Sequence, residues 1–588
     1  MPDDFKLTIA VLTDTHIRAP QGDLTSPFKV NERANARARY AVEVVKANTP
    51  ELTVHLGDMV HPLPHLPAYG AACAEAHRIF APLMPKLHYV PGNHDIGDKP
   101  GPASPAGPVT DNNCTAYEAA FGPPWKSFEN CGVRFIVINS SLVNTGGDAE
   151  QRQRDWLEKT LSEAEGQRVF LFSHYPLFID QPDEEEHYDN YAEPGRSWLL
   201  GLAVDHGVEA IFSGHVHQFF FNRYRGVKLY CLQPTSFTRQ DYAELYRGAP
   251  ANEFGRDDVD KYGVTFVDIF ADGHRLRIAP THGREIAPGE CPQIQTLHQP
   301  ATPIIPHMRH AWFEASTLPY NGPMEEFGRK RARNDYPLLR LWQLGIRTIR
   351  TPLRDLTDPV SRRRVLDFSA AGIQFSFFTL GLPDVASREL LAEHSDLVAS
   401  LEVVGRDRTF SDLQDGLSEL IEQWRKPLSI SKSTSSADET HESGAFAHNV
   451  STGFLWKERD EVVAAASNLA TPAMQLGLSF QVNLDEDPGQ RIPVLAECLS
   501  QSNLRLVAVI RLADRNPANS NFDDDKIAAQ LVAALDAARG RANVEIQSDT
   551  FEDIDRGYSP RHGLLDRRSN LRPISNWIVD NAMCCNRG

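Results

Sequence analysis

Short runs of apolar residues alternate with longer amphipathic segments through the first part of the chain. The apolar runs are rich in β-branched and aromatic residues, as is typical of buried strands. They lie at residues 7–12, 52–56, 87–90, 133–138, 169–172 and 208–212. Between them, apolar residues recur at helical spacing over 31–46, 71–84 and 151–163. The alternation predicts a layered α/β domain, with two long loops over 97–114 and 180–195 where the pattern breaks.

Five prolines between Pro288 and Pro306 follow no period. They predict a linker over 288–306, between a domain at 1–287 and a second domain at 307–588. The second domain repeats the strand and helix alternation more regularly. Its candidate strands lie at 311–315, 346–350, 373–379, 400–404, 428–432, 478–484, 506–512 and 543–548. Eight strands favour a (β/α)8-like barrel, although a doubly wound open sheet would show the same alternation.

Composition narrows the class of protein. With 41% hydrophobic and 23% charged residues, the chain resembles an ordinary globular protein. The net charge of -18 argues against nucleic acid as the main ligand. No basic leader and no apolar run long enough for a membrane span are evident, and the eight cysteines have no C-x-x-C spacing. We therefore expect a cytoplasmic protein with reduced thiols and without a membrane partner. We also expect that it can form a homo-oligomer.

Five polar motifs each directly follow one of the apolar runs of the first domain. They are TDTH (Asp14, His16), LGDMV (Asp58), PGNHD (Asn93, His94, Asp95), SHYP (His174) and SGHVH (His215, His217). In a layered α/β fold, the carboxyl ends of the strands meet at one edge, where ligands usually bind. A single histidine after a strand is usually structural, but this ordered set predicts a metal site.

Carboxylate and imidazole ligands together suit two divalent or transition metal ions, such as Mn, Fe, Zn or Co. Two side chains that are two residues apart just after the end of a strand can bind the same ion, as in Asp14-x-His16 and His215-x-His217. Asp58 follows a glycine and could bridge two ions. Paired metals stabilise both the attacking and the leaving oxygen of a displacement at phosphorus. His55 and His88 lie inside the candidate strands, and we expect them to be structural.

The ordered pattern D-x-H, G-D, G-N-H-D, H and G-H-x-H resembles the calcineurin-like metallophosphoesterase superfamily over about residues 7–235. The resemblance implies a fold of two sheets flanked by helices, and hydrolysis through a metal-bound hydroxide. It assigns one metal to Asp14, His16 and His217, the other to Asn93, His174 and His215, and the bridge between them to Asp58. It also places His94 beside the metals, oriented by Asp95, to bind the phosphoryl group or to protonate the leaving group.

The motif spacing is similar to that of cyclic-nucleotide and glycerophosphodiester phosphodiesterases within the superfamily. We therefore expect a small-molecule phosphodiester or phosphomonoester as substrate, with candidate substrate contacts at Arg18, His61, His65 and Tyr175. Two alternatives are a metal-dependent binding or scaffold protein and a nuclease. The intact His94–Asp95 pair favours the hydrolase, because a scaffold needs no proton donor, and the acidic balance argues against a nuclease.

Polar residues also gather at the predicted carboxyl ends of the barrel strands. They are Arg350, Arg354, Glu402, Lys432, Asn483, Asp485, Arg511 and Asp549. They fit either a site for an anionic or sugar-like molecule or the ion pairs of an inert scaffold. The lack of a metal pattern or an acid pair favours the scaffold.

Overall fold

The computed structural model describes residues 5–22, 25–101, 107–294, 296–297, 301–308, 312–318, 329–435, 449–467, 469, 476–514, 523–554, 561–575 and 577–578. The chain divides into two compact units, and neither is one continuous segment. Unit 1 comprises residues 1–298 and 314–339, and unit 2 comprises residues 299–313 and 340–588. Among the described residues, no helix is both long and apolar enough to cross a membrane.

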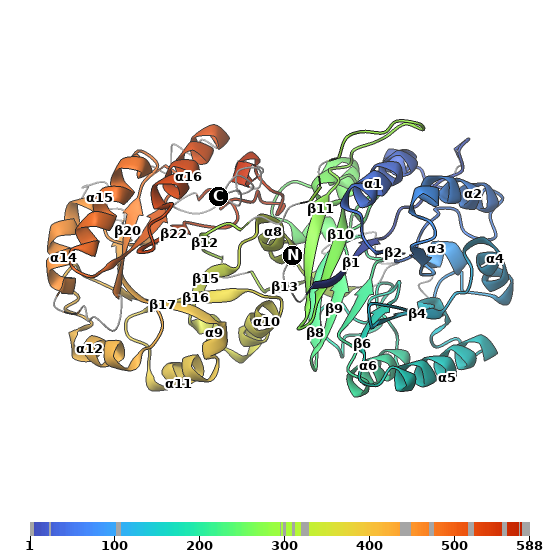
Figure 1. Cartoon of the computed structure of the whole chain (residues 1–588), viewed down its shortest axis with the longest axis horizontal. Helices are drawn as coiled ribbons and strands as arrows, with labels where there is room; N and C mark the ends of the chain where they lie inside the picture. The colour runs from blue at the N-terminus through green and yellow to red at the C-terminus, as the bar shows by residue number, and fades with distance from the viewer. Residues whose placement is uncertain are drawn as a thin grey trace. The chain divides into compact units, whose positions relative to one another are not determined.

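The described part of unit 1 contains two large sheets (Figure 1). The five-stranded sheet has the order β11 (His274–Pro280), β10 (Gly263–Phe270), β1 (Phe5–Leu12), β2 (Leu52–His55) and β3 (Leu87–Tyr89). The six-stranded sheet has the order β4 (Lys126–Asn130), β5 (Val133–Val137), β6 (Arg168–Phe172), β7 (Ala210–Ser213), β9 (Val227–Cys231) and β8 (Phe220–Tyr224). The strands β1, β2 and β3 are parallel to one another, as are β5, β6 and β7.

Alternation along the strands decides which side chains face the other sheet and which face the helices. On β6, Phe170 and Phe172 join a stack of aromatic rings between the sheets, and Phe170 lies 5.3 Å from the ring of His274 on β11. Val169 and Leu171 point the other way and pack in an apolar cluster with residues of helices α5 (Asp148–Glu163) and α6 (Gly195–Asp205). The predicted arrangement of two sheets flanked by helices is thus confirmed.

Helices α1 (Ala34–Asn48) and α2 (Tyr69–Phe80) cover the outer face of the five-stranded sheet in a second apolar cluster. Two further helices, α3 (Asn93–Ile96) and α4 (Asp111–Phe121), follow β3 in the chain. The loop expected over 97–114 therefore ends where α4 begins, because Thr110 caps that helix by accepting a hydrogen bond from the Asn113 N–H at 3.2 Å.

A hairpin from a later part of the chain completes unit 1. Strands β13 (Ala315–Leu318) and β14 (Lys330–Arg333) pair antiparallel, and this segment belongs to unit 1 although both of its flanks belong to unit 2. Leu318 and Ala332 pack in an apolar cluster with Phe220 of β8. Helix α8 (Tyr336–Leu344) then leads back to unit 2.

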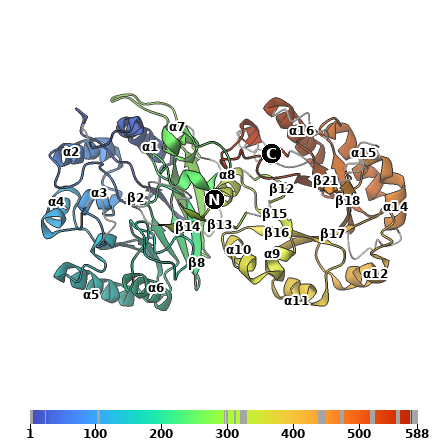
Figure 2. The ribbon, with the colours of Figure 1, turned by 180° about the vertical axis from the view of Figure 1, so that it is seen from behind.

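Unit 2 is a ring of parallel strands surrounded by helices (Figures 1 and 2). Its described strands have the order β12 (Ile304–Pro306), β22 (Val544–Ser548), β21 (Arg505–Ile510), β20 (Leu476–Val482), β18 (Leu428–Ser435), β17 (Val398–Gly405), β16 (Gln374–Leu380) and β15 (Thr348–Pro352). A parallel bridge between His307 and Arg350 joins the two ends of this order. The ring favours the predicted (β/α)8-like barrel over an open sheet.

The barrel helices follow the strands in turn. They are α9 (Arg354–Thr357), α10 (Pro359–Ala370), α11 (Val385–Glu393), α12 (Gln414–Gln423), α14 (Arg459–Ser467), α15 (Pro488–Ser500) and α16 (Asp524–Ala538). A short strand, β19 (Asn449–Thr452), pairs antiparallel with β18. Much of the polar loop expected over 433–449 lies outside the described residues.

The start of the barrel differs from the expectation. The first barrel strand is β12, inside the Pro-rich stretch expected to be a linker. Of the described residues in the candidate strand over 311–315, only Ala315 lies in a strand, at the start of β13. Prolines concealed β12 because they remove backbone donors from an extended segment. Pro306 ends the strand, where the next backbone donor, the His307 N–H, bonds to the Ser548 carbonyl at 3.2 Å.

The charged residues expected at the carboxyl ends of the barrel strands largely pair with one another. Arg350 Nε donates to Glu402 Oε2 at 2.7 Å, and Lys432 Nζ donates to Glu458 Oε1 at 2.8 Å. Arg511 Nε lies 3.1 Å from Asp549 Oδ2. These pairs fit the expected internal salt bridges of a scaffold.

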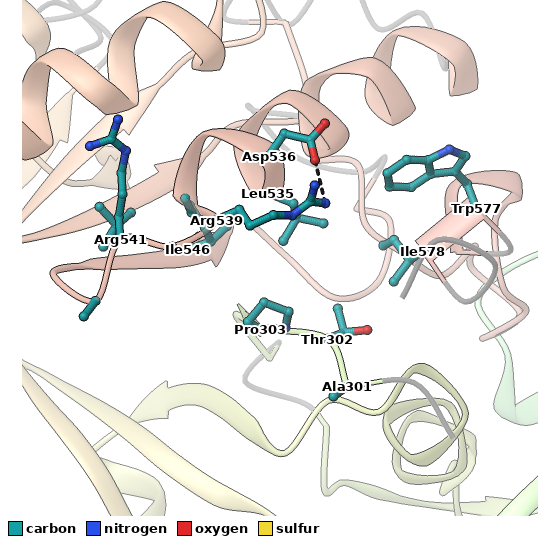
Figure 3. A pocket seen from close by; sticks show the side chains of 14 residues that line it. Ala301, Thr302, Pro303, Leu535, Asp536, Arg539, Arg541, Ile546, Trp577 and Ile578 are labelled. Carbon is teal, nitrogen blue, oxygen red and sulfur yellow. Dashed lines mark ion pairs between the residues drawn. The ribbon is translucent and has the colours of Figure 1, made fainter. Parts of the chain in front are cut away.

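A cavity of about 590 Å³ lies beside the amino-terminal ends of β12 and β22 (Figure 3). Thr302, Leu535, Val544 and Trp577 are among the residues that line it. Active sites of (β/α)8 barrels lie at the opposite, carboxyl-terminal end of the strands. The position of this cavity therefore indicates no catalytic role.

Candidate metal centre

The carboxyl ends of parallel strands bring the predicted ligands together. Asp14 and His16 follow β1, Asp58 follows β2, and Asn93 begins α3 just after β3. From the other sheet, His174 follows β6, and His215 and His217 follow β7. All seven residues are at most 3% exposed. The strand-end position expected from the sequence is therefore the observed one.

The backbone at the site is strained. Five of the seven predicted ligands have left-handed φ angles, which residues other than glycine rarely adopt. They are Asp14 (54°), His16 (45°), Asp58 (54°), His215 (71°) and His217 (52°). Such conformations persist where the surrounding structure enforces them, and they cluster at functional sites.

Two glycines permit the close approach of the ligand loops. A Cβ on Gly92 would lie 2.3 Å from Asp58 Oδ1, and a Cβ on Gly214 would lie 2.8 Å from Asp14 Oδ2. Both distances are too short for real atoms. A glycine is therefore needed directly before Asn93 and directly before His215.

The first cluster consists of Asp14, His16, Asp58 and His217, whose ligand atoms lie within 4.8 Å of one another. His217 Nε2 is 3.2 Å from Asp14 Oδ1 and 3.0 Å from His16 Nε2. His16 Nε2 is also 3.5 Å from Asp58 Oδ2. Four ligand atoms therefore converge on one point.

The second cluster consists of Asp58, His174 and His215, with the Asn93 amide beside them. His174 Nε2 lies 3.4 Å from Asp58 Oδ1 and 3.0 Å from Asn93 Oδ1. His215 Nδ1 lies 3.0 Å from the same Asn93 oxygen. Asp58 thus turns one carboxylate oxygen toward each cluster, as a bridging ligand requires.

Backbone carbonyls fix the tautomers of two histidines. His174 Nδ1 is 2.9 Å from the Leu56 carbonyl, and His217 Nδ1 is 2.7 Å from the Phe237 carbonyl. In the neutral ring, each Nδ1–H donates to that carbonyl, which leaves a lone pair on Nε2 pointing into the site. Metal-binding histidines are commonly oriented in this way.

Burial lowers the pKa of His16 and of His215 well below the usual value, so both rings are neutral and available as ligands. Burial would also lower the pKa of His174, but the Asp58 carboxylate outweighs it and raises this pKa to about 9.

The residues present fit divalent cations. Asp14 Oδ1 is buried and accepts no hydrogen bond from any described residue. A buried carboxylate oxygen without a donor is costly, and a lone pair of His217 faces it at 3.2 Å. A cation between these atoms would relieve both the desolvation and the repulsion.

His61 and His94, two other site residues expected from the sequence, lie beside His16 of the first cluster. His61 Nδ1 is 3.2 Å from His16 Nδ1, and the His61 ring stacks on His94 with centroids 5.1 Å apart. His94 packs edge to face on His16 at 4.7 Å, and its Nδ1 is 2.5 Å from the His61 carbonyl. His94 therefore borders the metal ligands. Its Nδ1 is held by the His61 carbonyl, which leaves Nε2 as the ring nitrogen that could act on a substrate.

The role expected for Asp95 needs correction, because its carboxylate does not orient the His94 ring. It accepts hydrogen bonds from the Val60 N–H at 3.2 Å and the Gly92 N–H at 2.9 Å. Asp95 is the third residue of the short helix α3, and its carboxylate bonds back to the helix cap as in a capping box. The His61 carbonyl orients His94 instead.

The structure also corrects the expected substrate contact at Tyr175. Its side chain is 1% exposed and its hydroxyl donates to Asp98 Oδ1 at 3.0 Å, so it packs behind the site. Arg18 is buried, with its backbone held by hydrogen bonds to the Asn35 amide at 2.8 and 2.9 Å. His65 is exposed and belongs to none of the possible metal-binding groups found among the described residues.

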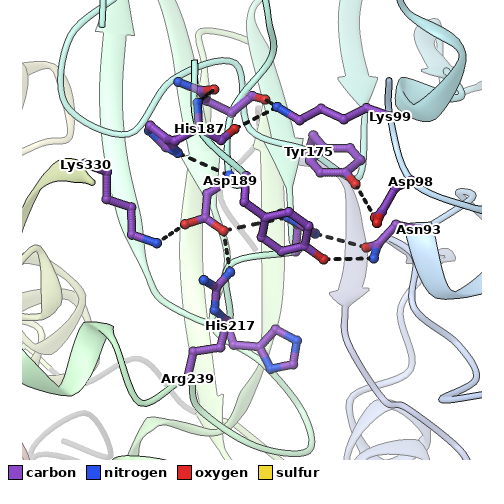
Figure 4. A network of polar contacts seen from close by, with 12 residues as sticks. Asn93, Asp98, Lys99, Tyr175, His187, Asp189, His217, Arg239 and Lys330 are labelled. Carbon is purple, nitrogen blue, oxygen red and sulfur yellow. Dashed lines mark hydrogen bonds and ion pairs between the residues drawn. The ribbon is translucent and has the colours of Figure 1, made fainter. Parts of the chain in front are cut away.

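Sequence reasoning missed a network of buried charges around Asp189, Arg239 and Lys330 (Figure 4), which lies next to His215. Asp189 Oδ1 lies 3.7 Å from His215 Nε2 and forms an ion pair with Arg239. Lys330, from the β13–β14 hairpin, forms ion pairs with both Asp189 and Asp241. The one available signal was the density of polar residues in the expected loop over 180–195, which contains Asp189.

Tyr188, also on that loop, fixes the orientation of Asn93. The Asn93 amide nitrogen donates to the Tyr188 hydroxyl at 3.1 Å, which leaves Asn93 Oδ1 facing His174 and His215.

Replacing Tyr188 with phenylalanine should weaken Mn²⁺ binding by about tenfold, because the amide loses the partner that orients it. Calorimetric titration of the metal-free protein measures this. Tyr224→Phe is the control, and equal affinities in the two variants would contradict the positioning role.

Comparison with known proteins supports the family resemblance. The calcineurin-like phosphoesterase family matches residues 7–219. The chain is similar to the serine/threonine-protein phosphatase CPPED1 of Bos taurus, with 30% identity over 204 residues, which is 33% of this chain and 62% of that protein. It is also 31% identical to the Mus musculus protein of that name over 189 residues, which is 30% of this chain and 57% of that protein. The chain thus spans less than two thirds of the length of these relatives.

A solved structure of purple acid phosphatase PPD1 from yellow lupin (Lupinus luteus) is 16% identical, with a TM-score of 0.34 over 48% of this chain and 52% of that one. The family match covers the motifs from Asp14 to His217, whose side chains form the two clusters. Residues 7–219 of this chain therefore belong to the calcineurin-like phosphoesterase family.

Proposed function

We propose that this protein hydrolyses a phosphoric ester with the help of two divalent or transition metal ions. The observation that carries the proposal is the pair of ligand clusters that share Asp58, with one carboxylate oxygen turned toward each. Cations held there would activate water and neutralise the charge that develops on the phosphoryl oxygens. The Asp14 oxygen without a hydrogen-bond donor supports a cation in the first cluster.

His94 is the residue placed to handle a proton. Its Nδ1 is fixed by the His61 carbonyl, and its backbone N–H donates to Asp58 Oδ1 at 2.9 Å. Binding of a phosphoryl oxygen, or protonation of the departing alcohol, would therefore take place at Nε2. The ring is only partly buried, so a substrate can reach this nitrogen.

The substrate proposed is a phosphomonoester or a small phosphodiester. The relatives are named as protein phosphatases, which adds phosphoserine and phosphothreonine in proteins to the monoesters that deserve testing. A direct experiment loads the full chain with Mn²⁺ and compares p-nitrophenyl phosphate, bis(p-nitrophenyl) phosphate and a phosphoserine peptide. If the loaded protein binds metal yet hydrolyses none of them or any other ester in a broad screen, the hydrolase proposal fails and a metal-dependent binding role replaces it.

Replacing His94 with alanine should lower kcat about 100- to 10,000-fold, because the proton is then transferred without a positioned group. The bound metal should be retained, since His94 is not among the seven proposed ligands. Steady-state hydrolysis and elemental analysis of the same preparation separate the two effects. His206→Ala is a suitable control, because His206 follows α6 at the opposite edge of the sheet from the ligands. Loss of metal together with activity would show that His94 acts as a ligand instead.

A further inference from the structure

Arg256 lies between two aromatic rings close to the metal centre. Its guanidinium carbon is 4.1 Å from the centroid of Phe28 and 4.6 Å from that of Phe237. Phe237 in turn packs against two proposed metal ligands, with its centroid 4.4 Å from the His217 ring and 4.8 Å from the His16 ring. One aromatic ring therefore separates this positive charge from the residues that hold the metals.

The guanidinium of Arg256 is poorly compensated by its surroundings. Among the described residues, its Nε is buried and has no hydrogen-bond partner. The carboxylates of Glu253 and Asp241 act on it more weakly than burial and the charge of Arg239 do. Arg239, which is nearby, pairs instead with Asp189 and Asp241. Burial, followed by the charge of Arg239, lowers the pKa of Arg256 to about 10, so the side chain is still charged at neutral pH.

A strained turn presents this side chain. Three consecutive residues before it have positive φ angles: Glu253 (52°), Phe254 (59°) and Gly255 (95°). The backbone is nevertheless held firmly, because the Arg256 carbonyl accepts hydrogen bonds from the Thr238 N–H at 2.9 Å and the Tyr262 hydroxyl at 3.0 Å. Strain of this kind persists where the surrounding structure enforces it, often where a side chain must be placed for a ligand.

We propose that Arg256 binds an anionic group of the substrate in addition to the phosphoryl group that is hydrolysed. Stacking between two rings holds the plane of the guanidinium and leaves its edge for a ligand. The forked N–H donors match a carboxylate or a second phosphate. The inference rests on the proposed function and deepens it, because the favoured substrates are phosphoesters that carry a second negative group.

The test uses matched pairs of probes with the Mn²⁺-loaded full chain. One pair is a phosphoserine peptide flanked by glutamates or by glutamines, and the other is propane-1,3-diol bisphosphate or its monophosphate. In Arg256→Gln, KM for the more charged member of a pair should rise about tenfold or more, while kcat and the KM of the less charged member stay unchanged. The pair that responds tells whether the second group is a peptide carboxylate or a phosphate.

A binding measurement keeps the inference independent of turnover. Calorimetry with propane-1,3-diyl bisphosphonate and with propylphosphonate should show the Arg256→Gln variant weakened about tenfold for the former alone. Arg256→Lys keeps the charge without the fork and should restore part of the affinity, which excludes misfolding as the cause. Arg225→Gln is the matched control, since Arg225 is exposed and stacks on Tyr224 at 5.4 Å in the β8–β9 turn.

The outcomes are distinct. Equal effects on both members of every pair, or no effect on any, would overturn the role of Arg256. Absence of hydrolysis by the wild-type protein, with charge-selective binding that depends on Arg256, would overturn the proposed function and leave the anion site in place.

Discussion

Replacing Asp58 with asparagine should lower the bound metal from about two ions per chain to one or none. It should also slow ester hydrolysis by roughly a thousandfold, because the charge that neutralises both cations is lost. Asp58 Oδ2 lies 3.5 Å from His16 Nε2, and Oδ1 lies 3.4 Å from His174 Nε2, so a single carboxylate serves both clusters. Elemental analysis after equilibration with Mn²⁺, together with the hydrolysis rate, measures the two effects.

A matched change elsewhere separates this effect from a general loss of negative charge. Asp205, at the exposed end of α6, can be changed to asparagine without touching either cluster, and that variant should keep its metal and its rate. Retention of both ions by the Asp58→Asn variant would refute the bridging role.

Replacing Lys330 with methionine should lower the free energy of unfolding of unit 1 by about 3–5 kcal/mol. Lys330 is fully buried and pairs with Asp189 and Asp241, which are themselves at most 2% exposed. Its removal leaves one buried carboxylate uncompensated, since Arg239 is then the cation that both must share. Differential scanning calorimetry of the full chain should show the transition of unit 1 at a lower temperature.

Two companion variants sharpen this test. Adding Asp241→Asn to Lys330→Met removes the excess charge and should recover part of the lost stability. Arg331→Met provides the surface control: Arg331 is the next residue on β14, its side chain is 64% exposed, and its ion pair with Asp180 should contribute less than about 1 kcal/mol. Equal losses for Lys330→Met and Arg331→Met would show that the buried network has no special role.

The ligand clusters could be predicted from the sequence because each ligand directly follows a strand. Asp14, Asp58 and His174 need only the strand pattern to be placed at a common edge, and the family resemblance then divides them between two metals. Fold class followed from the same alternation. The detailed roles of His94 and Asp95 could not be predicted. They depend on backbone groups such as the His61 carbonyl, and no sequence pattern shows where a carbonyl points.

Contacts between distant segments could not be predicted. Lys330 and Asp189 are 141 residues apart, and Lys330 lies beyond the Pro-rich stretch at which the sequence predicts the end of the first domain. The short strand β12 was concealed for a related reason: its register is set by β22, which lies more than two hundred residues later in the chain. Phe28, Phe237 and Arg256 likewise come together only in the folded molecule.

The path of the β13–β14 hairpin has a consequence for the order of events on the ribosome. Residues 1–298 emerge first, but the lysine that balances Asp189 and Asp241 is synthesised only after β12, a strand of the other unit. Until β14 leaves the exit tunnel, the first unit therefore lacks the lysine that pairs with these two acids, and its charge network is unfinished. Cutting the gene at the Pro-rich stretch would make that unfinished state permanent, whereas a fragment that ends after residue 339 would include the missing piece.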